Sequence, residues 1–284
     1  MEIIKSVETL KQVVQKAHRS GQSIGFVPTM GYLHNGHLEL IRQADRENNL
    51  CIVSIFVNPL QFGPGEDYEK YPRDIQADTE EAESAGCDIM FVPEADQLYP
   101  ANFSSFVEVE GLTGVLCGAS RPGHFKGVTT VVAKLFHIVT PTRAYFGQKD
   151  AQQALVIQKM VNDLNMNLEV VVVPTVREND GLAMSSRNAY LSVSERTAAT
   201  ILYKSLCQSK VLIQAGERSP DKIRNLILEK LGQEPLAKVD YVEVVDAATL
   251  QNFEQVLGKR VLIALAVRIG NTRLIDNLLM DIEA

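Results

Sequence analysis

Apolar runs alternate with helix-favouring stretches from residue 23 to residue 173, and this alternation restricts the possible folds more than any other feature of the sequence. The apolar runs have the length and composition of buried strands and lie at 23–27, 50–57, 87–92, 144–146 and 168–173. The helical patterns lie at 37–44, 74–85, 127–139 and 151–164. Strands that alternate with helices indicate βαβ units. We therefore expect an α/β fold, a Rossmann-like parallel sheet with helices on both faces.

The sequence changes character near Arg177. A polar loop spans 178–188, and the elements expected after it are helices at 193–215 and 220–231 and strands at 239–245 and 261–269. We predict two domains. A Rossmann-like domain spans 1–176, and a smaller α+β domain that acts as a lid spans 177–284.

Two histidines follow the first strand candidate, in the segment Pro-Thr-Met-Gly-Tyr-Leu-His-Asn-Gly-His at 28–37. The segment leads into a helix, whose N-terminus has unpaired backbone N–H groups that favour an anion. Gly31 and Gly36 let the backbone approach that anion closely. With two imidazole donors added, we interpret the segment as a phosphate site of an enzyme that attacks the α-phosphate of ATP. The segment alone also fits half a metal site or a helix cap with a surface imidazole.

Polar residues follow three other strand candidates. Asn58 and Gln61 follow the second strand, Lys149 and Asp150 the fourth, and Val176 the fifth. The carboxyl ends of parallel strands lie at one edge of a sheet, where ligands bind. Amides suit carboxylates and hydroxyls, and an ammonium suits phosphate. Taken separately, Asn-Pro is also a common turn signal, and Lys-Asp is also a common surface ion pair.

Two further segments contain donors for an anion. Residues 184–187 (Met-Ser-Ser-Arg) offer two hydroxyls and a guanidinium that can surround a pyrophosphate, although a helix cap with an exposed arginine is the simpler interpretation. Residues 121–126 (Arg-Pro-Gly-His-Phe-Lys) place three cationic groups before a helix. We interpret them as a lid that closes over the ligand, or as an ordinary exposed loop.

Composition argues against several partners. The formal net charge is −7 with no Lys/Arg block, so no nucleic-acid partner is expected. No apolar run approaches the ~20 residues of a membrane span, so no membrane association is expected. The four cysteines are dispersed without C-x-x-C spacing and are expected to be buried thiols. A cytoplasmic location follows from these features.

Five segments, in order along the chain, resemble the pantothenate synthetase (pantoate–β-alanine ligase) family, within the nucleotidylyltransferase-like Rossmann group. They read PTMGYLHNGH, VNPLQFG, RPGHFKGVTTVV, YFGQKDAQQ and DGLAMSSRN. The resemblance covers essentially the whole chain. It implies an ATP-dependent ligase that joins (R)-pantoate to β-alanine through a pantoyl adenylate and releases AMP and pyrophosphate.

The resemblance also implies site residues. His37, His34 and Lys149 would be catalytic, with His37 the proton donor. The residues that would bind ATP are Met30, Gly31, His34, Gly36, His37, Gly147, Gln148, Lys149, Asp150, Val176, Met184, Ser185, Ser186 and Arg187. Gln61 and Gln153 would bind pantoate, and Gln61 would also contact β-alanine.

Mg²⁺ is expected with ATP, since the leaving pyrophosphate needs charge neutralisation and Mg²⁺ usually binds through phosphates and waters. Asp78, on the 74–85 helix, is a candidate ligand. A homodimer is expected from the family resemblance alone.

Three alternatives share parts of this pattern. A nucleotidylyltransferase would transfer AMP to a small phosphorylated acceptor and keep it on the product. An aminoacyl-tRNA synthetase also uses His-x-Gly-His, but this chain lacks a basic face and is short for that class. A nucleotide sensor would bind ATP without releasing pyrophosphate. The paired amides Gln61 and Gln153 favour the ligase, because a phosphorylated acceptor would call for more cations.

Overall fold

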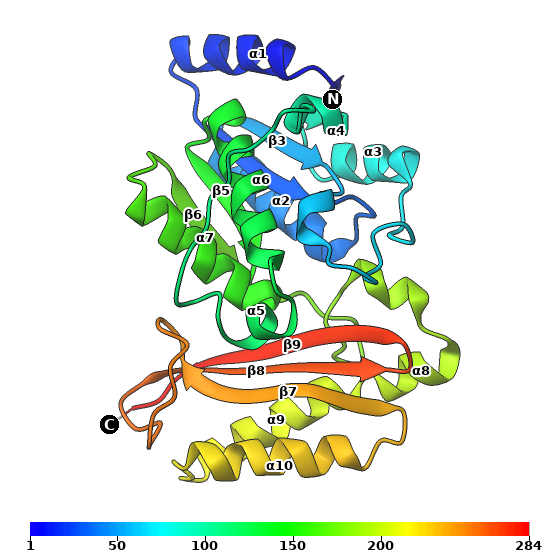
Figure 1. Ribbon diagram of the computed structural model, residues 1–284, viewed down its shortest axis with the longest axis vertical. Helices are drawn as coiled ribbons and strands as arrows, with labels where there is room; N and C mark the ends of the chain where they lie inside the picture. The colour runs from blue at the N-terminus through cyan, green and yellow to red at the C-terminus, as the bar shows by residue number, and fades with distance from the viewer. Residues whose placement is uncertain (284) are drawn as a thin grey trace. The chain divides into compact units, whose positions relative to one another are not determined.

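Six strands form a parallel sheet in the computed structural model, which describes residues 1–283 (Figure 1). They are β1 (Glu2–Ile4), β2 (Ile24–Thr29), β3 (Leu50–Ile55), β4 (Ile89–Phe91), β5 (Arg143–Gly147) and β6 (Glu169–Val173). Their order across the sheet is β1-β4-β3-β2-β5-β6, and all five neighbouring pairs are parallel. The order reverses at β2, since β3 and β4 lie on one side of it and β5 and β6 on the other. Ligands of open α/β sheets bind at the carboxyl ends of the strands near such a reversal.

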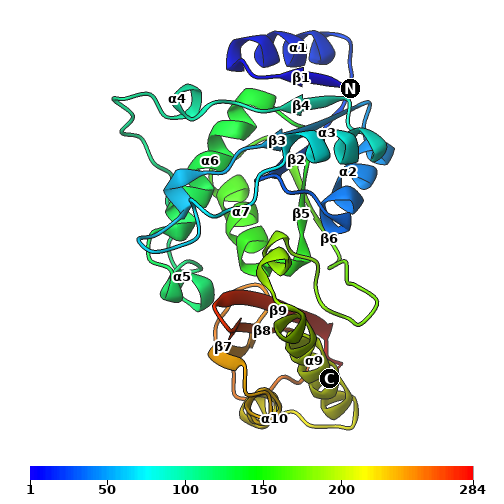
Figure 2. The same ribbon diagram turned by 90° about the vertical axis from the view of Figure 1, so that its right-hand side faces the viewer.

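Helices cover both faces of this sheet because successive strand side chains point to opposite faces. They are α1 (Val7–Arg19), α2 (Asn35–Glu47), α3 (Ile75–Ser84), α6 (His124–Val139) and α7 (Ala151–Asp163), and short turns lie at η1 (Pro59–Gln61), α4 (Ala95–Leu98) and η2 (Gln148–Asp150). Val27 and Val53 pack with Ile41 of α2, whereas Phe26 meets Phe136 of α6 edge to face. Figure 2 shows α2 and α3 on one side of the strands and α6 and α7 on the other. The predicted fold class is confirmed.

A three-stranded antiparallel sheet forms the second part of the structure, in the order β7-β8-β9. Its strands are β7 (Ala237–Asp246), β8 (Arg260–Ile269) and β9 (Thr272–Asp281), and its helices are α5 (Leu116–Ser120), η3 (Ser186–Tyr190), α8 (Val193–Ala198), α9 (Ile201–Gln214) and α10 (Pro220–Gly232). Apolar side chains of α9 and α10 pack with those of β7 and β8 in one buried cluster that includes Leu202, Ile227, Val244 and Ile263. This part is the predicted α+β unit.

The chain divides into two compact units. The N-terminal unit contains Met1–Thr113, Arg121–Gln148 and Gln152–Pro174, and the C-terminal unit contains Gly114–Ser120, Lys149–Ala151 and the chain from Thr175 onward. The sequence prediction placed one boundary between 176 and 177. The structure therefore assigns Gly114–Ser120 and Lys149–Ala151 to the C-terminal unit, whereas a single boundary along the sequence places them in the N-terminal unit.

Several predicted elements differ from the structure. The expected helix 193–215 is two helices, α8 and α9, because Thr200 and Leu202 donate i→i−3 hydrogen bonds at the junction and tighten the turn there. The helix expected at 127–139 begins three residues earlier, and the helix expected at 37 begins at Asn35. No strand was predicted at β9, whose apolar pattern is interrupted by the buried polar pair Asp276 and Asn277.

Candidate active site

The loop between β2 and α2 is fixed by backbone contacts at its first turn. Thr29 donates from Oγ1 to the carbonyl of Ser54 (2.8 Å) and accepts from the Gly31 N–H (3.1 Å). Gly31 has φ +81°, and a Cβ there would lie 2.8 Å from a carboxylate oxygen of Asp78. Tyr32 has φ +52°, a left-handed conformation that costs a non-glycine residue free energy. The loop therefore needs an anchor.

Asp78 of α3 supplies that anchor. Its Oδ2 accepts from the Tyr32 N–H (2.9 Å) and its Oδ1 from the Leu33 N–H (2.6 Å), and the residue is 3% exposed. Burial raises the pKa of the carboxyl group, and the two N–H donors offset part of that rise. Both oxygens that a metal ion would use accept backbone hydrogen bonds. Asp78 thus positions the loop, and its role as a metal ligand stays a prediction.

His34 and His37 lie together at the N-terminus of α2. Their rings stack with centroids 4.0 Å apart and planes 27° from parallel. His34 is the N-cap, and its Nδ1 accepts the Gly36 N–H at 3.1 Å. This bond places the ring proton on Nε2, which leaves Nε2–H as the donor atom of His34. The helix cap that the segment alone also fits is therefore present, and it is formed by His34 of the stacked pair.

Gln61 lies at the carboxyl end of β3, where neighbouring side chains fix its amide. Gln61 is 9% exposed, and its amide accepts from Asn58 Nδ2 at 3.1 Å and donates to the Met30 sulfur at 3.1 Å. Asn58 is 1% exposed and also donates to the Gly127 carbonyl, while Tyr99 donates to its Oδ1. The Asn58 amide thus points inward and positions Gln61. The residue type alone indicated only an amide suited to a ligand.

Residues 121–127 are fastened to the chain around Gln61, although the sequence suggested a lid. Arg121 pairs with Glu66 (2.6 Å), His124 Nδ1 lies 2.8 Å from the Gln61 carbonyl oxygen, and Lys126 pairs with Glu108 (3.2 Å). Burial opposes ionisation of Glu66, but the hydrogen bonds and charge of Arg121 outweigh it and lower the pKa of Glu66. The three cationic groups therefore have protein partners in this structure.

The strand β5, which neighbours β2, ends at Gly147, and Gln148 follows at the start of η2. Gln153 lies in the first turn of α7 and is partly buried. The N-terminal unit therefore brings eight predicted residues to the carboxyl ends of three neighbouring strands. They are Met30, Gly31, His34, Gly36, His37, Gln61, Gly147 and Gln148.

The other residues predicted to bind ATP lie in the C-terminal unit, on two segments. Lys149 and Asp150 are neighbours in η2, with Lys149 Nζ 3.4 Å from Asp150 Oδ2. The Met184 N–H donates to the Val176 carbonyl at 3.0 Å, so these two predicted residues are paired through their backbones.

The Met-Ser-Ser-Arg segment continues directly into η3. Ser185 caps η3 by accepting the Arg187 N–H at 3.3 Å, and Ser186 is 7% exposed. The cap expected in the simpler interpretation is present, and it orders the backbone of the segment.

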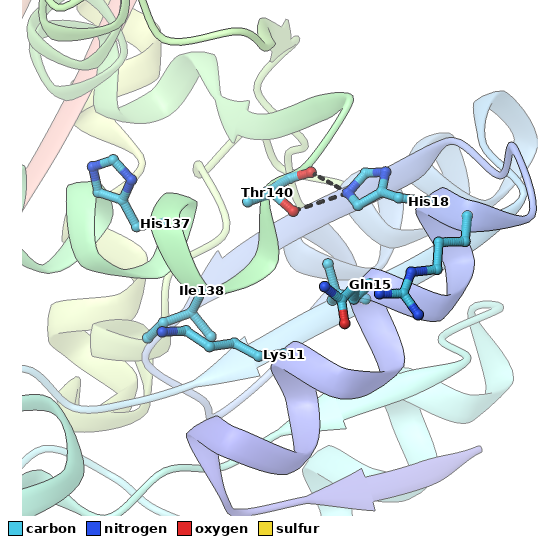
Figure 3. Close-up of a pocket in the computed structure, with 8 residues that line it drawn as sticks. Lys11, Gln15, His18, His137, Ile138 and Thr140 are labelled. Carbon is cyan, nitrogen blue, oxygen red and sulfur yellow. Dashed lines mark hydrogen bonds between the residues drawn. The ribbon is translucent and has the colours of Figure 1, made fainter.

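A pocket of about 450 Å³ lies elsewhere, between α1 and the C-terminal end of α6 (Figure 3). His18 Nε2 lies 3.0 Å from the Thr140 carbonyl oxygen, and His137 extends away from it. Thr140 precedes β5, so this pocket lies at the amino ends of the strands. None of the predicted site residues lines it, and a structural role for His18 accounts for its contacts.

No metal-binding cluster accompanies the site. Within residues 1–283, no group of three or more His, Cys, Asp or Glu side chains is placed to hold a metal ion. Over the same residues, no helix is long and apolar enough to cross a membrane.

Comparison with known proteins identifies the family. The family model for pantoate-beta-alanine ligase matches residues 2–279. The chain belongs to the pantoate–β-alanine ligase family. Among relatives of this family, the pantothenate synthetase of Acetivibrio thermocellus is 54% identical over 282 residues, which is 99% of this chain and 100% of that protein. The pantothenate synthetase of Carboxydothermus hydrogenoformans is 55% identical over 284 residues, which is 100% of both chains.

Solved structures of pantoate–β-alanine ligases agree with the fold. The crystal structure of pantothenate synthetase from Thermus thermophilus has a TM-score of 0.92 and 47% identity, and the match covers 98% of this chain and 99% of that one. The Francisella tularensis pantoate-beta-alanine ligase, complexed with beta-gamma ATP and beta-alanine, has a TM-score of 0.80 and 36% identity over 98% and 97% of the chains. Both matches extend over the parallel sheet and the small antiparallel sheet.

Proposed function

We propose that this protein is an ATP-dependent pantoate–β-alanine ligase that forms pantothenate, AMP and pyrophosphate. The observation that carries the proposal is the stacked His34–His37 pair at the N-terminus of α2. Beside it, the buried Gln61 amide bonds to Met30 of the same loop, in a chain that belongs to this ligase family. Anion-directed donors next to an uncharged amide suit a nucleotide phosphate and a small hydroxy acid.

The chemistry proceeds in two balanced steps. A pantoate carboxylate oxygen attacks the α-phosphorus of ATP, a new P–O bond forms, and the bond to pyrophosphate breaks. The neutral amine of β-alanine then attacks the carbonyl carbon of the mixed anhydride, and AMP leaves with the oxygen that bridged the two groups. The amine proton is released as the amide forms. Adenylation is required because a carboxylate oxide is a poor leaving group.

The catalytic residues act on the first step. His34 Nε2–H would donate to a phosphate oxygen, His37 would be the proton donor, and the Lys149 ammonium would offset charge that develops on the phosphates. Positioned donors of this kind stabilise a transition state by several kcal/mol, about 3–4 for one donor in comparable oxyanion sites. The tautomer set by Gly36 and the cap at the start of α2 support the role of His34.

The binding residues divide into those that would contact ATP and those that would contact pantoate or β-alanine. Met30, Gly31, Gly36, Gly147, Gln148, Asp150 and Val176 would contact ATP with the three catalytic residues, and Met184, Ser185, Ser186 and Arg187 would contact its triphosphate. Gln61 and Gln153 would bind pantoate, and Gln61 would also contact β-alanine. The buried, hydrogen-bonded setting of Gln61 supports this role, because an amide already fixed in orientation loses little entropy on binding.

Mg²⁺ would enter the site already bound to the phosphates of ATP. The described residues include no dedicated set of three metal ligands, and Asp78 is engaged by backbone N–H groups. Mg²⁺ commonly binds through substrate phosphates and waters, with few protein ligands, so this donor set fits an ion carried by the nucleotide. The bound ion would neutralise charge on the phosphates.

A homodimer and a cytoplasmic location complete the proposal. The homodimer is proposed from the family likeness alone, and its mass in solution tests it. The location is supported by the four cysteines, none of which forms a disulfide and three of which are buried, as is usual in a reducing compartment.

Product analysis tests the proposed reaction. Protein with ATP and Mg²⁺ should release pyrophosphate when pantoate is added, and AMP and pantothenate when β-alanine follows, each detected by mass. Retention of AMP on a phosphorylated product would instead indicate a nucleotidylyltransferase. ATP binding without pyrophosphate under any of these conditions would contradict the ligase and favour a sensor.

A further inference from the structure

Two neighbouring polar side chains are buried in the middle of β9. Asp276 is 3% exposed and Asn277 is 6% exposed, and the other buried residues of the strand are Thr272 and Leu274. A buried carboxylate and a buried amide cost free energy unless they are hydrogen-bonded. Their partners therefore show what the pair does.

Asp276 binds Arg177 through two parallel hydrogen bonds. The Arg177 guanidinium donates from Nη1 to Oδ2 (2.7 Å) and from Nη2 to Oδ1 (2.9 Å). The same guanidinium donates to the Gly181 carbonyl at 3.0 Å and lies 4.1 Å from the ring centroid of Tyr203. Since a fork-to-fork pair fixes orientation as well as distance, Arg177 has one defined position.

Arg177 stands at the base of the loop that carries the Met-Ser-Ser-Arg segment. Its backbone forms an antiparallel bridge with Ala183, and the next residue, Met184, donates to Val176. Fixing Arg177 therefore fixes the backbone immediately before residues 184–187.

Asn277 holds the other ATP-directed segment of the same unit. Its Nδ2 donates to the Lys149 carbonyl at 2.9 Å. The Asn277 N–H in turn donates to Asp276 Oδ1 at 2.8 Å, which ties the two residues to each other. One dipeptide of β9 thus contacts the backbone of Lys149 and, through Arg177, the base of the 184–187 segment.

We propose that Asp276 and Asn277 are positioning residues for ATP, which set the relative placement of Lys149 and residues 184–187. The inference rests on the proposed roles of those residues. A buried ion pair seldom adds net stability over an apolar pair of similar size, so stability alone does not account for Asp276 and Arg177. Precise placement of the neighbouring ATP-directed segments accounts for the pair, because a misplacement of about 1 Å at a catalytic group can cost roughly 10²-fold in rate.

The test measures ATP binding and kinetics of the full-length Asn277→Ala and Asp276→Asn variants. We expect the ATP dissociation constant, measured by titration calorimetry, and the ATP KM each to rise about tenfold, as for one lost buried hydrogen bond. The pantoate KM should change less than about twofold. Asp240→Asn is the matched control, because it breaks an Arg–Asp pair on the same sheet (Arg273 Nε to Asp240 Oδ2, 2.9 Å) that contacts neither ATP-directed segment.

An apolar replacement separates positioning from folding. The double variant Arg177→Met with Asp276→Leu removes both charges, and its melting temperature should stay close to the wild-type value. We expect its ATP dissociation constant and ATP KM to remain raised. A double variant with wild-type melting temperature and wild-type ATP binding would overturn the proposal, as would wild-type ATP binding in Asn277→Ala.

These readouts distinguish the inference from the proposed function. Calorimetry reports ATP binding without turnover, so weaker binding in the variants supports the inference even if the wild-type protein forms no pantothenate. Wild-type protein that forms pantothenate, with variants that bind ATP normally, would leave the function standing and refute the positioning role.

Discussion

Single residues in the β2–α2 loop do their work through the contacts that orient them. His34 is at once the cap of α2 and half of a stacked histidine pair. Asp78 holds the two N–H groups that follow Gly31, although it lies on a different helix. The donors expected to face the phosphates are therefore oriented before any ligand binds, which is the condition for strong electrostatic catalysis.

Replacement of His37 by alanine should reduce adenylation without unfolding the protein. We expect pantoate-dependent pyrophosphate release to fall about 10²–10³-fold, as for loss of one positioned donor in an oxyanion site. The melting temperature should change little, because His37 is not the cap of its helix. His137→Ala, which removes an exposed histidine on α6, is the control and should keep the wild-type rate. Equal rates in both variants would refute the role of His37.

Asp78→Asn tests the anchor of the loop. An asparagine has one acceptor oxygen where two N–H groups need an acceptor, and it places an N–H₂ against a backbone donor. We expect the free energy of unfolding, measured in urea, to fall by about 1–3 kcal/mol and adenylation to slow. Asp74→Asn is the control because asparagine and aspartate cap helices equally well, and Asp74 is the N-cap of α3. A fully active and stable Asp78→Asn variant would show that the anchor is dispensable.

At the scale of elements, close packing between η1 and α6 shapes the substrate side of the site. A Cβ on Gly127 would lie 2.2 Å from the Leu60 carbonyl oxygen, so only glycine allows this approach. The approach lets Asn58 reach the Gly127 carbonyl while it holds Gln61. The Arg121–Glu66 ion pair joins the chain just before α6 to the chain just after η1.

Glu66→Gln should weaken this fastening in a pH-dependent way. Since the folded-state pKa of Glu66 lies below its ordinary value of 4.5, the ion pair stabilises the protein above that pH, and the stabilisation is lost as the pH falls through the lowered pKa. We expect the variant to lose about 1–2 kcal/mol of unfolding free energy at neutral pH. The difference from wild type should shrink as the pH falls below 4.5.

Urea titrations at several pH values measure this difference. Glu108→Gln, which removes a more exposed partner of Lys126, should cost about 0.5 kcal/mol or less. A Glu66→Gln deficit that stays constant down to acid pH would show that the charge of Glu66 is not the cause.

The elements also show which features a sequence can predict. Apolar runs predicted five of the six parallel strands, because buried central strands read as uninterrupted apolar segments. The short edge strand β1 has one buried residue of three and gives no such signal. β9 was missed because Asp276 and Asn277 interrupt its pattern, and their partners Arg177 and Lys149 are about a hundred residues away in sequence or more. Sequence motifs predicted the candidate site residues. The positioning role of Asp78 could not be predicted, because it depends on tertiary hydrogen bonds to Tyr32 and Leu33.

On the scale of the whole molecule, the chain is two units with separate cores. One core lies around the parallel sheet and the other between the antiparallel sheet and its helices. Their segments interleave along the chain, since Lys149–Ala151 belongs to the C-terminal unit. Each unit orients the predicted ATP residues that it carries through hydrogen bonds within that unit.

Isotope transfer from pantoate to AMP tests the adenylate mechanism most directly. Pantoate labelled with ¹⁸O in both carboxylate oxygens is turned over with ATP, Mg²⁺ and β-alanine, and the AMP is analysed by mass. Because the attacking oxygen stays on phosphorus when the amine displaces AMP, we predict one ¹⁸O in each AMP and one in the amide of each pantothenate. Unlabelled AMP alongside pantothenate formation would contradict attack of the carboxylate on the α-phosphate.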